Sequence, residues 1–298
     1  MKISFTGHEG NGLVGTRFVP EGQLNGEVVL LLHGGGQTRH SWAATARDLA
    51  RQGHCAITLD LRGHGDSDWS AEGNYQFSDF ADDVKIVVDD VSAEFGRKPV
   101  VIGASLGGMA AMIFAGEVAS EAASEAAGEQ QRGLLAGLVL VDITPTVKMD
   151  GVEKILGFMG SRSVEGFATL QDAADEIAAY LPHRPRPKDL SGLEKNLRLG
   201  KDGRYRWHWD PAFLASRKQT DERKVIEAQL SSAVRRLTMP VMLVRGRDSE
   251  LVGDKEVAAF LELVPHAQVA DVSGARHMVA GDKNDVFAKA VTGFIDRL

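Results

Sequence analysis

Short apolar runs alternate along this chain with segments whose apolar residues recur at helical spacing. Runs rich in Val, Ile and Leu, the pattern of strands buried on both faces, occupy residues 28–32, 56–59, 100–102, 138–141 and 241–244. Segments such as 78–95 and 286–295 carry apolar residues three and four positions apart, which predicts amphipathic helices. This alternation predicts an α/β fold, with a mainly parallel central sheet flanked by helices.

Two departures from the alternation shape the expected domain organisation. Residues 3–6 and 13–19 are short strand-like runs that predict a hairpin before the parallel sheet. Residues 146–235 lack strand alternation, contain several prolines and include amphipathic pieces. We therefore expect a helical cap over 146–235, inserted into a core made of residues 1–145 and 236–298.

Composition narrows the class of protein. The 298 residues are 43% hydrophobic and 25% charged, as in a globular protein with a substantial core. A net charge of −7 argues against a nucleic-acid partner. No apolar run is long enough to cross a membrane, the first residues do not resemble a signal peptide, and Cys55 has no second cysteine to pair with. We expect a cytoplasmic protein without a membrane partner.

The strongest chemical signal is the sequence Gly103-Ala104-Ser105-Leu106-Gly107, which follows the apolar run 100–102. It matches G-x-S-x-G, in which a serine stands on a sharp turn between a strand and a helix. The flanking glycines keep side chains out of that turn, and the first N–H groups of the helix point toward an oxyanion formed beside the hydroxyl. The motif predicts that Ser105 is a nucleophile.

Two other short motifs occur, but the residues around them argue against the binding functions that they usually indicate. Residues 10–15 match G-x-G-x-x-G, but a strand rather than a helix follows them, which argues against dinucleotide binding. Residues 103–108 share the glycine spacing of a phosphate-binding loop, yet Met109 stands where a lysine is required. No metal-ligand spacing occurs. We therefore expect no cofactor and no metal.

Four local sequences occur in the order found in one superfamily. They are His33-Gly34-Gly35-Gly36, the run from Asp60 to Ser67, the turn at Ser105, and Gly274-Ala275-Arg276-His277. With these, the chain resembles the α/β-hydrolase superfamily over nearly its whole length, and is most similar to capped esterases, lactonases and haloperoxidase-like enzymes. The resemblance implies structural hydrogen bonds for His33 and His64.

A serine hydroxyl needs a base, and a carboxylate must orient that base. His277 follows the last strand and is the best-placed of the nine histidines. The resemblance places the acid at Asp248, just after the strand 241–244, with Glu250 and Asp142 as alternatives. The expected triad is Ser105, Asp248 and His277, in the order of the family.

The remaining site residues follow from the need for an oxyanion hole and a pocket. We expect the N–H groups of Leu106 and Gly35 to form the hole, with Gly36 as the alternative to Gly35. Pocket candidates are Gly36, Trp42, Trp207, Trp209 and Phe213, each of which also suits core packing. The excess of five positive charges between Arg184 and Arg206 suits an anionic substrate, a solvated surface or a contact in a homo-oligomer.

These observations predict a serine hydrolase that cleaves a small or medium carboxylic ester or lactone. Carbon–carbon bond hydrolysis and perhydrolysis of the haloperoxidase-like kind are alternatives that need the same triad. A ligand receptor on the same fold is a third alternative from a different class.

Overall fold

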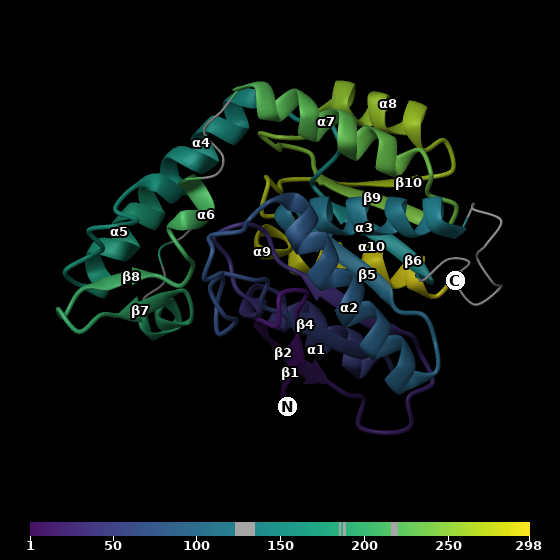
Figure 1. Cartoon of the computed structure of the whole chain (residues 1–298), viewed down its shortest axis with the longest axis horizontal. Helices are drawn as coiled ribbons and strands as arrows, with labels where there is room; N and C mark the ends of the chain where they lie inside the picture. Colours follow the sequence, from purple (N-terminus) through teal and green to yellow (C-terminus); the bar gives the residue numbers. More distant parts are fainter. Residues whose placement is uncertain (123–134, 185, 187–188, 216–219) are drawn as a thin grey trace.

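A twisted sheet forms the centre of the molecule (Figure 1). The computed structural model describes residues 1–122, 135–184, 186, 189–215 and 220–298. Within them, eight strands form one sheet in the order β1 (Lys2–Thr6), β2 (Gly12–Phe18), β4 (Cys55–Leu59), β3 (Val28–Leu32), β5 (Val100–Ala104), β6 (Gly137–Val141), β9 (Val241–Gly246) and β10 (Gln268–Val272). The β1–β2 and β2–β4 pairs are antiparallel, and β4 to β10 are parallel. Both the N-terminal hairpin and the parallel sheet were expected.

Helices cover both faces of this sheet. Alternate residues of β3 pack into two separate apolar clusters, with Leu30 and Leu32 in one and Val29 and Leu31 in the other. The first cluster lies under α2 (Phe77–Phe95), α3 (Leu106–Ala122), α7 (Thr220–Val234) and α8 (Asp254–Leu263). The second lies under α1 (Ala43–Arg51) and α10 (Asn284–Ile295). Burial on both faces explains why the strands are continuous apolar runs.

A second layer stands apart from the sheet, on the left in Figure 1. It contains α4 (Met149–Gly160), α5 (Leu170–Tyr180), the 3₁₀ turn η3 (Ser191–Lys195), the hairpin of β7 (Leu197–Leu199) and β8 (Tyr205–Trp207), and the short helix α6 (Ala212–Ala215). The hairpin was not expected, because three-residue strands are too short to show an alternating pattern.

The outer layer is smaller than the cap expected over 146–235. Helix α7 packs against α3 of the core, and a Cβ placed on Gly116 of α3 would lie 2.5 Å from Cα of Ala233 in α7. Such close contact between two helix backbones places α7 with the core rather than with the outer layer. Residues 123–134, where an extension of α3 was expected, lie outside the described residues.

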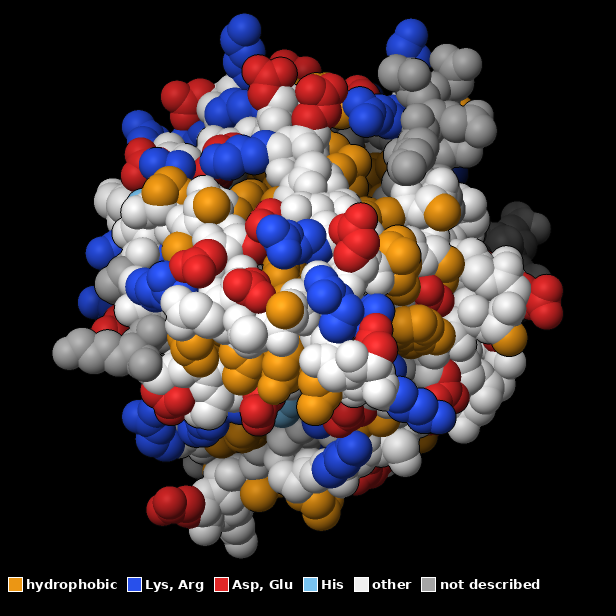
Figure 2. Space-filling view, turned by 90° about the vertical axis from the view of Figure 1, so that its left-hand side faces the viewer, with side chains coloured by type: hydrophobic (Ala, Val, Ile, Leu, Met, Phe, Trp, Pro, Cys, Tyr) orange, Lys and Arg blue, Asp and Glu red, His pale blue; other side chains and the backbone are white. Residues whose placement is uncertain are grey.

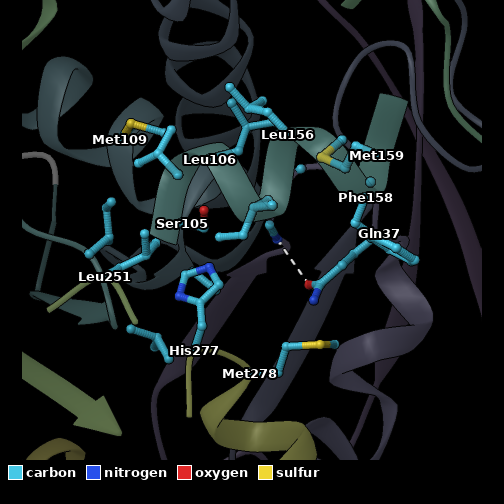
Figure 3. Close-up of a pocket in the computed structure, with 18 of the residues that line it drawn as sticks. Gln37, Ser105, Leu106, Met109, Leu156, Phe158, Met159, Leu251, His277 and Met278 are labelled. Atoms are coloured by element: carbon cyan, nitrogen blue, oxygen red, sulfur yellow. Dashed lines mark hydrogen bonds between the residues drawn. The ribbon is translucent and has the colours of Figure 1, made fainter. Parts of the chain in front are cut away.

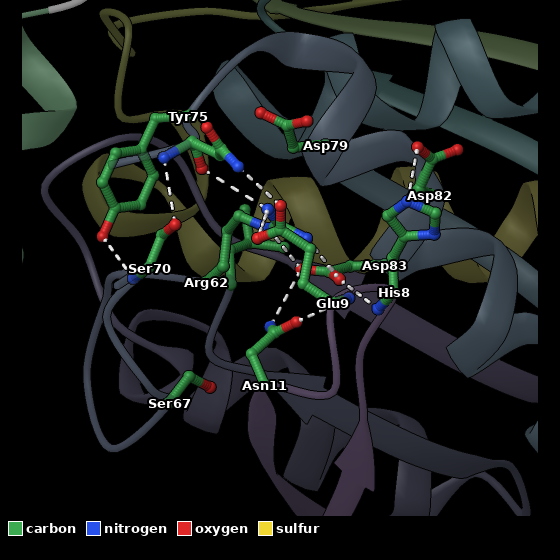
Figure 4. A network of polar contacts seen from close by, with 12 residues as sticks. His8, Glu9, Asn11, Arg62, Ser67, Ser70, Tyr75, Asp79, Asp82 and Asp83 are labelled. Carbon is green, nitrogen blue, oxygen red and sulfur yellow. Dashed lines mark hydrogen bonds and ion pairs between the residues drawn. The ribbon is translucent and has the colours of Figure 1, made fainter. Parts of the chain in front are cut away.

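A buried charged network holds the loop after β4 in place (Figure 4). The guanidinium of Arg62 is almost inaccessible to solvent and donates from Nε and Nη2 to the two carboxylate oxygens of Asp83 on α2, at 2.7 and 2.8 Å. A third donor reaches Glu9 Oε2 at 3.1 Å. The bidentate pair compensates the buried charges of Arg62 and Asp83. The network therefore fixes the loop after β4 to the N-terminal turn and to α2.

Candidate active site

Ser105 lies on a strained turn between β5 and α3. Its φ of 45° is in the left-handed region, which is unfavourable for a residue with a side chain. The turn is crowded on every side: a Cβ on Gly103 would lie 2.6 Å from the carbonyl oxygen of Gly107, and one on Gly107 would lie 2.6 Å from Cβ of Leu32. These contacts are the physical reason for the glycines of the motif.

The imidazole of His277 points toward Ser105 from the loop after β10 (Figure 3). Its Nδ1 lies 2.8 Å from Oδ2 of Asp142, the residue that follows β6. Asp142 is fully buried, and its other carboxylate oxygen accepts the backbone N–H of Gly246 at 3.1 Å. Since a carboxylate only accepts, Nδ1 carries a proton and donates it to Asp142, which leaves Nε2 as the basic nitrogen.

The structure does not place Asp248 at His277, contrary to the sequence-based expectation. Asp248 is exposed, and its backbone N–H donates to the carbonyl of Ala275 at 3.0 Å. The alternative, Asp142, has the position instead. Strands β6 and β9 are parallel neighbours, with Val141 beside Val244, so residues that follow the two strands emerge at the same edge of the sheet. Either strand end can therefore supply a carboxylate.

Glu250, the other alternative, supports the loop rather than the ring. Its Oε2 accepts the backbone N–H of His277 at 3.4 Å, and its Oε1 lies 3.3 Å from Arg276. Burial works against ionisation here, but the backbone N–H groups of Glu250 and His277, with Lys154 and Arg276, hold the pKa of Glu250 below its usual value.

Ser249 is a member of this arrangement that sequence reasoning missed. Its Oγ lies 2.6 Å from the same Asp142 oxygen that faces His277. The same Oγ accepts the N–H groups of Leu251 and Val252, each at 3.0 Å, so its own proton must point to Asp142. No sequence signal identifies Ser249 until the acid has been placed at Asp142.

The three glycines after β3 differ in whether their backbone N–H groups have partners among the described residues. The N–H of Gly34 donates to Oε1 of Gln37, and that of Gly36 donates to Nε2 of His64, both at 3.1 Å. Among the described residues the N–H of Gly35 has no such partner, and neither has that of Leu106 in the first turn of α3. Gly36 is thereby removed as an alternative donor, and Gly35 and Leu106 remain.

Two neutral histidines fix these loops, as the resemblance implied. His33 Nε2 accepts the N–H of Leu61, so its Nδ1–H donates to the carbonyl of Gly34 at 2.8 Å. Burial lowers the pKa of His33 to about 4. His64 has the same arrangement, with Nδ1 donating to the carbonyl of Arg62 at 2.9 Å. Both rings thus join the loop after β3 to the loop after β4.

A cavity of about 570 Å³ opens in front of Ser105 and His277. It is lined mainly by apolar side chains of the core and of the outer layer, and all five pocket candidates, Gly36, Trp42, Trp207, Trp209 and Phe213, are among its lining residues. Sequence reasoning missed the methionines and aliphatic residues of α4, including Ile155, Leu156 and Met159. Their helical spacing was visible, but nothing in it showed which face would meet the cavity.

The aromatic candidates also pack against other rings. Trp207 contacts Phe158 and Phe167 within the outer layer, with ring centroids 5.6 and 5.1 Å apart. Phe213 instead lies against His64, at 5.0 Å, and against Tyr75 of the core. These aromatic residues therefore both line the cavity and pack against neighbouring rings.

The basic segment of the outer layer is largely paired with acids or carbonyl groups. Arg184 binds Asp282, Arg186 binds Asp175, and Arg206 binds Asp202, while Arg204 donates to two backbone carbonyls. Lys188 lies outside the described residues. Figure 2, which faces the outer layer, shows basic and acidic side chains interspersed rather than separated. This surface is not a uniform basic patch.

The described residues contain no group of three or more His, Cys, Asp or Glu side chains suited to a metal ion. Within the same residues, no helix combines the length and the apolar character needed to span a membrane.

The sequence of the chain matches a known protein family. Residues 27–283 match the family model described as alpha/beta hydrolase fold. The chain belongs to this family, and it is an α/β-hydrolase enzyme.

Particular relatives lie within the same class. The chain is 30% identical to esterase Rv0045c of Mycobacterium tuberculosis over 275 residues, covering 90% of this chain and 82% of the esterase. It is 26% identical to 2-(acetamidomethylene)succinate hydrolase of Mesorhizobium japonicum over 244 residues, covering 80% and 78% of the two chains. Among solved structures, E-2-(acetamidomethylene)succinate hydrolase superposes with a TM-score of 0.79 at 24% identity, covering 99% of this chain and all of the other.

Proposed function

We propose that this chain is a serine hydrolase that cleaves a small or medium carboxylic ester or lactone through an acyl-enzyme. The observation that carries the proposal is the hydrogen bond of 2.8 Å between Asp142 and His277, with the imidazole facing Ser105 in an apolar cavity. The similarity to an esterase supports it. A small molecule is the expected substrate, because the cavity is of the size that takes one.

In this mechanism Oγ of Ser105 attacks the substrate carbonyl carbon while Nε2 of His277 takes the hydroxyl proton. The carbonyl oxygen becomes an oxyanion, which accepts the N–H groups of Leu106 and Gly35. When the tetrahedral intermediate collapses, His277 gives its proton to the departing alkoxide, and the acyl group stays on Ser105. Water then attacks the acyl-enzyme while His277 takes its proton. When the second tetrahedral intermediate collapses, His277 returns that proton to Oγ of Ser105 and the carboxylic acid leaves.

Asp142 has two roles in this sequence. It holds the imidazole in the tautomer with Nε2 unprotonated, and it stabilises the imidazolium after proton transfer. Its own charge is stabilised by the N–H of Gly246 and the hydroxyl of Ser249.

The outer layer of α4, α5, β7, β8 and α6 acts as a cap in this proposal. It adds apolar walls to the cavity and no member of the triad, so it selects substrates by shape and apolar contact. We place its end before α7 rather than at residue 235, because α7 packs on α3.

Covalent labelling with a fluorophosphonate tests the proposal, followed by turnover of p-nitrophenyl esters of increasing chain length. The wild-type chain should be labelled and should hydrolyse esters, whereas Ser105→Ala should fold, resist labelling and lose about 10⁴-fold or more in kcat. Turnover of a tenth of wild type by Ser105→Ala would refute Ser105 as nucleophile. Labelling without ester turnover would favour carbon–carbon bond hydrolysis or perhydrolysis with the same side chains.

A further inference from the structure

Gln37 occupies a place in the cavity that the proposed mechanism does not use. It follows the three glycines after β3, lines the cavity and is partly exposed to it. Figure 3 shows its side chain on the opposite side of the hollow from Leu251 and His277, with the carboxamide directed inward. The side chain therefore presents a polar group in an otherwise largely apolar space.

The orientation of this carboxamide is fixed by the backbone. Oε1 accepts the N–H of Gly34 at 3.1 Å, and the backbone N–H of Gln37 donates to the carbonyl of Gly34 at the same distance. An N–H can only donate, so the amide oxygen must face Gly34 and the amide nitrogen must face away from it. In the part of the chain that the structure describes, Nε2 of Gln37 has no protein partner.

The carboxamide is also close to the reacting centre. A methyl group built on Gly34 would lie 3.3 Å from Cβ of Ser105 and 3.4 Å from Oε1 of Gln37. Ser105 and the carboxamide of Gln37 thus flank Gly34. Both residues line the same cavity, so an acyl group on Ser105 would share that space with the carboxamide.

We propose that Gln37 is a specificity-determining residue, whose Nε2 donates a hydrogen bond to an oxygen acceptor that the acyl group carries near its scissile carbonyl. The substrate class is then an ester of an oxygen-substituted acid, such as an alkoxy, keto or carboxylated acyl group, rather than a simple alkanoate. The inference rests on the proposed ester hydrolysis at Ser105. It follows from a donor that is fixed, unpaired and adjacent to the nucleophile.

Two esters of equal length test this preference: p-nitrophenyl methoxyacetate and p-nitrophenyl butyrate, which differ by an ether oxygen in place of a methylene. The informative variant is Gln37→Glu, because it keeps the oxygen that accepts from Gly34 and removes the donor. We expect its kcat/KM to fall at least about fivefold more for the methoxyacetate than for the butyrate, the value of one hydrogen bond. The intrinsic reactivity of each ester cancels when variant and wild type are compared on the same ester.

Asn196→Asp is the matched control, because it makes the same amide-to-acid change at another point of the cavity lining. It should change both esters by the same factor. Equal losses for the two esters in Gln37→Glu would overturn the specificity role and leave only a loop-holding role. If wild type hydrolyses neither ester and resists the fluorophosphonate, the proposed function fails, and this inference fails with it.

Discussion

The two sides of the cavity are built on different principles. On the core side, hydrogen bonds hold several of the polar groups near Ser105: Asp142 holds His277, Gly246 and Ser249 hold Asp142, and His64 holds the glycine loop. On the side of the outer layer, the proposed cap, side chains such as Leu156, Met159 and Trp207 contribute apolar contact area. Directional bonds fix atoms to fractions of an ångström, whereas apolar contacts fix shape only.

This difference separates the groups that hold the reacting atoms from the groups that contact the rest of the substrate. Substitution of a side chain that holds His277 or Asp142 removes an interaction that the transition state needs, so it should lower kcat. Substitutions on the cap side remove contacts that bound substrate and transition state share, so they should raise KM. The following predictions test where that division holds.

The largest effect should come from Asp142. We expect Asp142→Asn to lower kcat by about 10⁴-fold, because an amide at this position stabilises the wrong tautomer of His277. The matched change Asp248→Asn should lie within about twofold of wild type, since Asp248 is exposed and its side chain does not reach the imidazole. Steady-state kinetics of the two variants show which aspartate orients His277. A large loss of kcat in Asp248→Asn with little loss in Asp142→Asn would reverse the assignment.

Ser249→Ala should have the next largest effect. The hydroxyl donates to a buried carboxylate, and a hydrogen bond to a charged group contributes about 1.5–3 kcal/mol, so kcat should fall by roughly 10- to 100-fold with KM little changed. Ser273→Ala, at an exposed serine in the turn after β10, is the control. A fall in thermal stability with full kcat would mean that Ser249 only holds its loop.

Trp207→Ala should change the preference of the enzyme for acyl chain length. Loss of a buried apolar side chain removes about 1–3 kcal/mol of contact, so KM for longer acyl esters should rise by roughly tenfold or more while turnover of the acetate changes little. Trp207 is a cleaner probe than Trp209, which forms a β-bridge with His64 and so touches the core side. Complete loss of acetate turnover in a folded Trp207→Ala protein would show a catalytic group in the cap.

The smallest effect should come from the ion pair between Arg184 of the cap and Asp282 of α9 (Val279–Asp282). Burial works against the charge of Asp282, but the N–H of Arg276 and the guanidinium of Arg184 hold its pKa below the usual value. A depressed pKa means that the ionised group stabilises the fold above about pH 4 and ceases to do so as pH falls through the folded value. Asp282→Asn should therefore lower Tm by about 2–4 °C at pH 7, with the difference closing toward pH 3 in thermal melts.

The sequence predicted the parallel sheet, the hairpin and the turn at Ser105, because each depends on local patterns. Strands buried on both faces have continuous apolar sequences. The turn at Ser105 requires glycines because a Cβ at those positions would clash with neighbouring atoms. The same locality explains the placement of His277, which follows the last strand of the sheet.

The carboxylate that binds His277 could not be predicted from the sequence around it. Asp142 and Asp248 each follow a parallel strand, and those strands are neighbours, so chain order alone favours neither. What separates them is burial: Asp142 has a φ of 50° and faces inward to Gly246 and Ser249, while Asp248 turns to solvent. The limits of the cap also depended on a contact distant in sequence, between α7 and α3.

Strained backbone angles in the candidate active site limit the thermal stability that this protein can reach while it stays active. Among the described residues other than glycine, positive φ occurs at Ser105, Asp142 and Arg162, and two of these three belong to the site. Each such residue costs on the order of 1–3 kcal/mol, which glycine would largely relieve. Variants selected for heat tolerance alone should therefore drift toward glycine at Ser105 and Asp142 and lose turnover as they do, so that selection for stability must be coupled to selection for activity.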